Sequence, residues 1–206
     1  MALANLAKDP YSIIITGVGG QGNVLASRIL GSMLVNKGYF VTIGETFGAS
    51  QRGGSVMSHL RVSGQSCWSP QIPVGTADVI ASLEPIEAVR VLADYGNPSV
   101  RVLTNTRPIY PVNVIKGETT YPALDELKAS IQSLVPGALF IDATEEAIKL
   151  GDAIFANIIM LGALHGMHIL PLERADFAQT IAERVKKDKV AINMQAFDIG
   201  AALIAA

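Results

Sequence analysis

Four glycines between residues 17 and 22 have the spacing of a phosphate-binding turn. The segment that holds them is Thr16-Gly17-Val18-Gly19-Gly20-Gln21-Gly22. It follows the apolar run of residues 12–15 and precedes residues 23–30, which have helical spacing, so it is predicted to join a strand to a helix. Glycine there permits a tight bend, lets an anion approach the backbone and lets the helix pack close to the strand. The N–H groups and dipole of the helix would then face an anion or nucleotide. The alternative is that the glycines only pack helix against sheet.

A second segment with binding chemistry follows a predicted strand at residues 39–43. It reads Glu45-Thr46-Phe47-Gly48-Ala49-Ser50-Gln51-Arg52-Gly53-Gly54-Ser55. Arg52 offers a planar fork of donors and its two glycine neighbours let a ligand approach the backbone, which is the chemistry of an anion clamp. A structural turn with Arg52 in a salt bridge is the alternative. Glu45 lies near the place of the acidic residue that binds ribose in NAD enzymes, so a free-standing NAD(P)-dependent oxidoreductase is a second hypothesis.

The residues that usually bind metals are sparse. Cys67 is the one cysteine, so the chain can form no internal disulfide and cannot by itself build an iron–sulfur cluster or a cysteine zinc site. His165 and His168 are three residues apart, but no neighbouring acid or cysteine completes a metal site. We therefore predict no metal site, and the cysteine content fits a reducing cytoplasm.

The composition indicates one apolar α/β domain spanning residues 1–206. Of the 206 residues, 50% are hydrophobic and 17% charged, which predicts a large core, a buried partner surface or both. The net charge of −2 and the lack of a basic tract argue against a nucleic-acid partner. Residues 153–170 carry no Asp, Glu, Lys or Arg, but Asn157, His165 and His168 favour a helix buried in protein over a membrane span. No signal peptide is expected at residues 1–10.

Strand-like and helix-like segments alternate along the chain. Strands are predicted at residues 12–15, 39–43, 55–62, 77–83, 100–105 and 138–142, and residues 44–54 are predicted to form a long loop. Helices are predicted from residue 23 to a stop at Lys37-Gly38 and at 84–92, 124–134, 143–150, 153–167, 171–185 and 190–204, with Asp188 and Lys189 breaking the last two. Residues 107–122 are predicted to be an irregular connection. The pattern predicts a Rossmann-like, doubly wound, mostly parallel sheet with a helical C-terminal layer.

Segments spread over most of the chain share the pattern of one family. They are residues 17–22 and 45–55, Ser69-Pro70-Gln71-Ile72-Pro73, Ala77-Asp78, Leu83-Glu84-Pro85-Ile86-Glu87-Ala88-Val89-Arg90, Asn157, Leu161-Gly162 and Asn193-Met194-Gln195-Ala196-Phe197. With them the chain resembles the gamma-type subunit of the 2-oxoacid:ferredoxin oxidoreductases. Residues 69–73 and 84–90 look most similar to the small (beta) subunit of indolepyruvate ferredoxin oxidoreductase.

This resemblance implies a reaction and a set of partners. In the family, a 2-oxoacid is decarboxylated on thiamine diphosphate with Mg, the acyl group passes to coenzyme A, and electrons leave through [4Fe-4S] clusters to ferredoxin. The chain has neither the cysteines nor a Gly-Asp-Gly…Asn thiamine motif, so a large partner subunit is expected to carry both cofactors. The substrate would be indolepyruvate or another aryl pyruvate, in a cytoplasmic, oxygen-sensitive hetero-oligomer. The isolated chain is expected to be inactive and able to form a homodimer.

The resemblance also implies roles for individual residues. Gly17, Gly19, Gly20 and Gly22 would shape an anion-receiving turn, with Gly53 and Gly54 beside it. Gln21 and Ser50 would offer donors. Arg52 and Ser55 would face the active-site cleft or coenzyme A. A non-catalytic assembly subunit remains a third hypothesis.

Overall fold

The computed structural model describes residues 6–48 and 53–205. The strands are β1 (Tyr11–Val18), β2 (Phe40–Phe47), β3 (Ser55–Ser63), β4 (Val79–Ser82), β5 (Arg101–Asn105) and β6 (Leu139–Ile141). The helices are α1 (Asn23–Asn36), α2 (Pro85–Tyr95), α3 (Val112–Ile115), α4 (Leu124–Leu134), α5 (Ala143–Lys149), the 3-10 turn η1 (Ala153–Phe155), α6 (Ala156–Gly166), α7 (Arg174–Arg184) and α8 (Lys187–Ala205). Together they form the α/β architecture that the alternating pattern predicts.

One six-stranded sheet in the order β2-β3-β1-β4-β5-β6 forms the centre of the molecule. β1, β4, β5 and β6 pair in parallel, whereas β3 runs antiparallel to both β1 and β2. The prediction of a mostly parallel, Rossmann-like sheet is therefore confirmed. After β1 the chain leaves toward the β2 edge, and after β4 it leaves toward the β6 edge. The carboxyl ends of β1 and β4 thus form a topological switch point, where open α/β sheets bind ligands.

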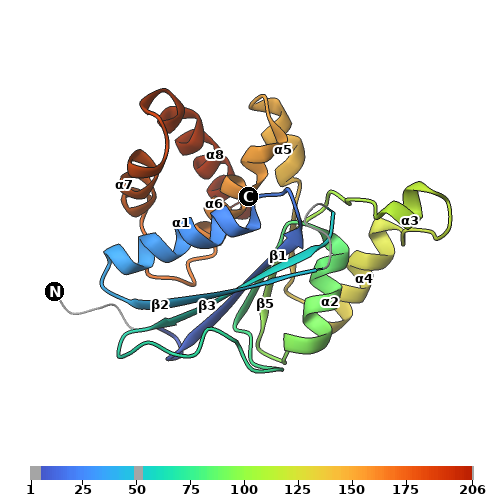
Figure 1. The fold of residues 1–206 in the computed structure, drawn as a ribbon, viewed down its shortest axis with the longest axis horizontal. Coiled ribbons are helices and arrows are strands. Elements are labelled where there is room, and N and C mark those ends of the chain that lie inside the picture. Colours follow the sequence, from blue (N-terminus) through green and yellow to red (C-terminus); the bar gives the residue numbers. More distant parts are fainter. Residues whose placement is uncertain (1–5, 49–52, 206) are drawn as a thin grey trace.

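Helices cover both faces of the sheet (Figure 1). Ile13 and Ile15 of β1 pack into a core shared with α1, α6 and α8. Ile14, which points to the opposite face, packs into a second core with α2 and α4. This burial on both faces explains why all eight residues of β1 are buried and why Ile13, Ile14 and Ile15 are consecutive rather than alternating with polar residues.

α6 is the most deeply enclosed helix of the C-terminal layer, since nine of its eleven residues are buried. It packs closely on α8, where a Cβ atom added to Gly162 would lie 1.9 Å from the Phe197 carbonyl oxygen. The prediction of a helix buried in protein is confirmed for α6. No helix within residues 6–48 and 53–205 combines the length and apolar content that a bilayer span requires.

Four departures from the predicted elements have a local reason. β2 continues to Phe47 because Gly44 to Phe47 pair with β3, so four of the eleven residues of the predicted loop are strand. The irregular connection contains the single turn α3. The helix predicted over 153–167 begins as a 3-10 turn capped by the Asp152 side chain. α8 begins at Lys187, so Asp188 and Lys189 lie inside its first turn and do not break it.

Candidate functional site

The glycine-rich turn joins the end of β1 to the start of α1, as predicted. Gly20 and Gly22 have φ angles of 105° and 83°, a region that residues with side chains rarely adopt. A Cβ atom on Gly22 would also lie 2.1 Å from the Asn157 amide nitrogen of α6. No side chain caps α1, so the N–H groups of its first turn have no intrahelical acceptor and are available to an anion.

The Gln21 side chain, which was predicted to offer a donor to a ligand, is hydrogen-bonded to the backbone at the switch point. Its Oε1 accepts a 2.9 Å hydrogen bond from the Val18 N–H, and its Nε2 donates a 2.9 Å bond to the Leu83 carbonyl. The Asn105 amide donates to that same carbonyl at 3.0 Å. The ends of β1, β4 and β5 are thereby tied together, and Asn105 is a member of this network that sequence reasoning missed.

The two predicted binding segments meet directly. The Gly19 N–H donates a 2.8 Å hydrogen bond to the Gly54 carbonyl, and the Gly53 N–H returns a 3.2 Å bond to the Gly19 carbonyl. The Gly48 N–H donates to the Ser55 carbonyl at 2.8 Å, which closes the base of the loop between β2 and β3. Gly53 and Gly54, which precede β3, are therefore hydrogen-bonded to the glycine-rich turn. Ser50 and Arg52 lie outside the described residues, so their predicted roles stay predictions.

Ser55 is anchored to α2. Its hydroxyl donates a 2.5 Å hydrogen bond to Oε2 of Glu87, and Arg90 donates to Oε1 of the same carboxylate at 2.9 Å. Glu87 is 3% exposed, so the position of Ser55 is set by a buried, doubly paired carboxylate. Sequence reasoning placed Glu87 at a helix start, where the dipole favours acids, and missed this contact.

Two cavities share Gly19 and Gly20 in their walls. The larger, about 710 Å³, lies between the start of α1 and the ends of β2 and β3, and is lined by Gly19, Gly20, Gly22, Asn23, Val24, Phe47, Gly48 and Val56. The smaller, about 340 Å³, lies at the switch point and is lined in part by Gln21, Leu83 and Ile109. Asn23 is 2% exposed, and its Oδ1 has no hydrogen-bond partner among the described residues. This buried oxygen is an unsatisfied acceptor in a residue that lines the larger cavity.

A buried carboxylate organises the segment beyond the switch point. Glu84 is fully buried and accepts hydrogen bonds from the Glu87 and Ile109 N–H groups and from the Tyr121 hydroxyl. Burial raises the pKa of the Glu84 carboxyl, and burial together with this hydrogen bond raises the pKa of Tyr121. The irregular connection is therefore held at both Ile109 and Tyr121.

The structure does not favour the dinucleotide hypothesis. Glu45 lies within the edge strand β2, and its carboxylate pairs with Arg28 of α1 at 3.4 Å. The switch point, where a dinucleotide would lie, is crossed by the Gln21 side chain. Glu45 is thus engaged by Arg28, and the alternative of a free-standing NAD(P)-dependent oxidoreductase is not favoured.

Metal-binding chemistry is sparse in the part of the chain that is described. Cys67 is exposed and unpaired, and residues 6–48 and 53–205 hold no group of three His, Cys, Asp or Glu residues that could share an ion. A lone thiol does not fit an iron–sulfur cluster, which needs several cysteine ligands. Of the two histidines, His165 packs on Phe197, with ring centroids 5.3 Å apart, whereas His168 is exposed.

The sequence matches one family over nearly its whole length. Residues 12–203 match the family described as pyruvate ferredoxin/flavodoxin oxidoreductase. The chain is 41% identical over 191 residues to indolepyruvate oxidoreductase subunit IorB of Pyrococcus horikoshii, covering 92% of this chain and 94% of that protein. It is 36% identical over 189 residues to the protein of the same name from Archaeoglobus fulgidus, covering 92% of each.

Solved structures share the fold. The gamma subunit of a keto/oxoacid ferredoxin oxidoreductase from Geobacter sulfurreducens superimposes with a TM-score of 0.67 at 21% identity, covering 95% of this chain and 99% of that one. The 2-oxoglutarate:ferredoxin oxidoreductase of Magnetococcus marinus superimposes with a TM-score of 0.73 at 19% identity. That match covers 96% of this chain and 31% of the other, so there the same fold is one part of a longer chain.

Proposed function

The chain belongs to the pyruvate ferredoxin/flavodoxin oxidoreductase family and is a subunit of a 2-oxoacid oxidoreductase, and we propose that it serves an enzyme acting on indolepyruvate or another aryl pyruvate. The two IorB relatives described above support this substrate class, because each aligns with the chain over 92% of both sequences or more. A large partner subunit would hold thiamine diphosphate, Mg and the [4Fe-4S] clusters, which supply the decarboxylation and electron-transfer chemistry, with ferredoxin as acceptor.

We further propose that this chain helps to bind coenzyme A at the glycine-rich turn. The observation that carries the proposal is the pair of hydrogen bonds between Gly19 and the Gly53–Gly54 backbone, which mounts the β2–β3 loop beside the uncapped start of α1. The phosphate groups of coenzyme A would accept hydrogen bonds from the first N–H groups of α1 and from the guanidinium of Arg52. The Asn23 Oδ1 suits an amide or hydroxyl of the same molecule.

The remaining wall of the 710 Å³ cavity is apolar where Phe47, Val24 and Val56 face it. Phe47 is 58% exposed, which is high for a large aromatic residue of a soluble subunit. Contact with coenzyme A or with the partner subunit would cover this ring. The chain would therefore orient the thiol acceptor and exclude water, while bond breaking takes place on groups held by the partner.

Kinetics of the assembled enzyme test the coenzyme A proposal. Arg52→Ala should raise the KM for coenzyme A about tenfold, because it removes a charge-assisted pair to phosphate. Arg184→Ala, on the exposed face of α7, is a control that should leave this KM unchanged. If Arg52→Ala assembles normally and its kinetics for both substrates equal those of the wild type, Arg52 has no role in ligand binding.

A further inference from the structure

A cavity of about 380 Å³ opens at the amino ends of β1 and β5, at the opposite end of the sheet from the glycine-rich turn. It is lined by Ala7, Tyr11, Arg101, His168, Ile169, Leu170 and Pro171. Tyr11 is the first residue of β1 and Arg101 is the first residue of β5. The remaining wall is the connection between α6 and α7. A volume of this size suits a small organic molecule.

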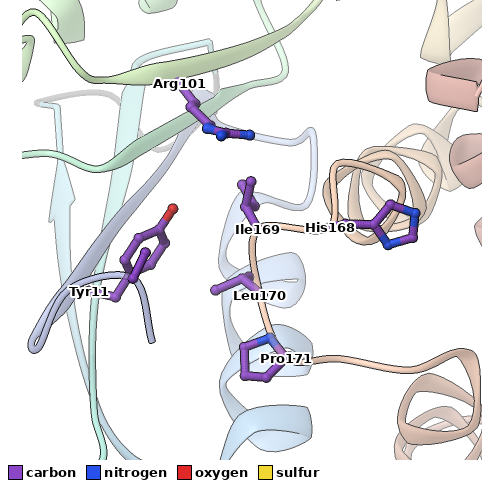
Figure 2. A pocket seen from close by; sticks show the side chains of 7 residues that line it. Tyr11, Arg101, His168, Ile169, Leu170 and Pro171 are labelled. Carbon is purple, nitrogen blue, oxygen red and sulfur yellow. The ribbon is translucent and has the colours of Figure 1, made fainter. Parts of the chain in front are cut away.

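Two hydrogen-bond donors converge in this cavity. Figure 2 shows the Arg101 guanidinium and the Tyr11 hydroxyl turned toward the space beside Ile169 and Leu170, while the His168 ring points away. Burial raises the pKa of Tyr11, and the negative charge of Asp78 raises it further, so its hydroxyl keeps its proton and acts as a donor at neutral pH. Ile169, Leu170 and Pro171 supply an apolar wall.

Arg101 is exposed at this end of the sheet, and no carboxylate among the described residues neutralises its charge. Its side chain makes no ion pair or hydrogen bond with any residue in the described ranges, 6–48 and 53–205. By contrast, Lys8 pairs with Asp78 at 3.2 Å. Asp78 also accepts a 2.7 Å hydrogen bond from the Ser12 N–H, so both of its oxygens are engaged. The guanidinium fork is thus the free charged group of the cavity.

The backbone beside the cavity is held in an uncommon conformation. His168 has a φ angle of 52°, in the left-handed region that non-glycine residues seldom adopt. The His168 N–H donates a 3.0 Å hydrogen bond to the His165 carbonyl, which closes a turn at the end of α6. The left-handed conformation of His168 then directs residues 169–171 along the cavity. Such conformations persist where the surrounding structure imposes them, and they are frequent at ligand sites.

The charges decide which anion fits. A carboxylate matches the planar fork of arginine and leaves an oxygen for the Tyr11 hydroxyl. The lining of the cavity offers one guanidinium and no lysine, so a second negative charge on the ligand would lack a cationic partner. A neighbouring cavity of about 520 Å³ shares Arg101 and is lined by Val100, Val135, Leu139 and Met167 among others, which gives room for an apolar group.

We propose that the cavity between Arg101, Tyr11 and residues 169–171 is a binding site for a small monocarboxylate with an apolar, aryl or branched alkyl body. The carboxylate pairs with the guanidinium and the tyrosine hydroxyl, and the apolar body packs on Ile169 and Leu170. This site is separate from the coenzyme A proposal and does not depend on it.

A nuclear magnetic resonance titration of the isotope-labelled full chain with phenylacetate tests the site. We expect saturable shifts at Tyr11, Ile169 and Leu170 with a Kd on the order of 1 mM. Phenylacetamide has the same shape without the charge, and it should bind at least about tenfold more weakly. Succinate should also bind more weakly, because it carries a second charge.

Variants complete the test. Arg101→Gln should weaken phenylacetate binding at least about tenfold, and Tyr11→Phe should weaken it by a smaller factor. Arg107→Gln, which removes an exposed arginine at the other end of β5, should leave binding unchanged. The proposal is wrong if a folded chain shows no saturable shifts, if phenylacetamide binds equally well, or if Arg101→Gln retains wild-type affinity.

Discussion

The Ser55 hydroxyl and the Glu87 carboxylate form a 2.5 Å hydrogen bond that fastens the start of β3 to α2. Ser55 directly follows Gly54, whose carbonyl accepts from the Gly19 N–H. The bond therefore fixes the base of the β2–β3 loop from one side, while the glycine-rich turn holds it from the other. Ser55, for which the family resemblance implies a place at the cleft, is thus held in position by the scaffold.

Removal of the Glu87 carboxylate should destabilise the chain. Glu87→Ala leaves Ser55 without its acceptor and Arg90 without its partner, so we expect the free energy of unfolding to fall by about 2 kcal/mol. Glu87→Gln keeps an acceptor and should cost about 1 kcal/mol. Urea unfolding of both variants measures these changes in the free energy of unfolding. Glu145→Ala is the control, because its pair with Arg107 is exposed on both sides. Equal midpoints for Glu87→Ala and the control would contradict the anchoring role.

The close crossing of α6 and α8 should tolerate no side chain at Gly162. Its added Cβ would lie 1.9 Å from the Phe197 carbonyl oxygen, so the helices must separate. We expect Gly162→Ala to lower the free energy of unfolding by about 3 kcal/mol or more. Gly137→Ala is the control, since a Cβ there meets no atom within 4 Å. If thermal unfolding gives both variants the same melting temperature, the helices do not cross as described.

His59 should make stability depend on pH. Its ring is 3% exposed, and burial lowers its pKa below the ordinary value of 6.5. The unfolded chain therefore binds a proton more readily than the folded chain, so the stabilisation is complete above pH 6.5 and is lost as the pH falls below it. Between pH 7.5 and 5.5 the loss attributable to His59 should be at most about 1.4 kcal/mol.

The matched variants for this prediction are His59→Gln and His168→Gln, measured by urea unfolding at both pH values. His59→Gln should reduce the difference between the two pH values. His168→Gln, at an exposed position, measures the effect of the substitution away from the buried ring. A His59→Gln chain with the full wild-type pH dependence would show that the buried ring does not titrate in this range.

Much of the architecture could be predicted from residue patterns. β1 and α1 were found on either side of the glycines because their apolar spacing is unambiguous, and α4 was predicted with the bounds that the structure gives it. The predicted strand ends too early at Ile43, because Gly44 and Glu45 have low strand propensity; their pairing with His59 and Ser58 of β3 overrides that preference.

The partners of the site residues could not be predicted, because they are distant in sequence. Glu87 lies 32 residues from Ser55, and the Leu83 carbonyl lies 62 residues from Gln21. Hydrophobic periodicity predicts which helix or strand carries such a residue, but it does not predict which element lies opposite that residue in the fold. The proximity of the glycine-rich turn to Gly53 and Gly54 depends likewise on β3 pairing beside β1, which no local signal specifies.

Anaerobic co-purification followed by an oxoacid assay tests the central claim most directly. The chain, recovered from its source by a tag, should bring with it a large cysteine-rich subunit that contains thiamine diphosphate. The complex should then reduce a viologen dye only when indolepyruvate or a related aryl pyruvate and coenzyme A are both present, and separating the chain from its partner should abolish that reduction. A chain that is recovered alone, or one that binds a nicotinamide nucleotide and reduces it unaided, would contradict the assignment.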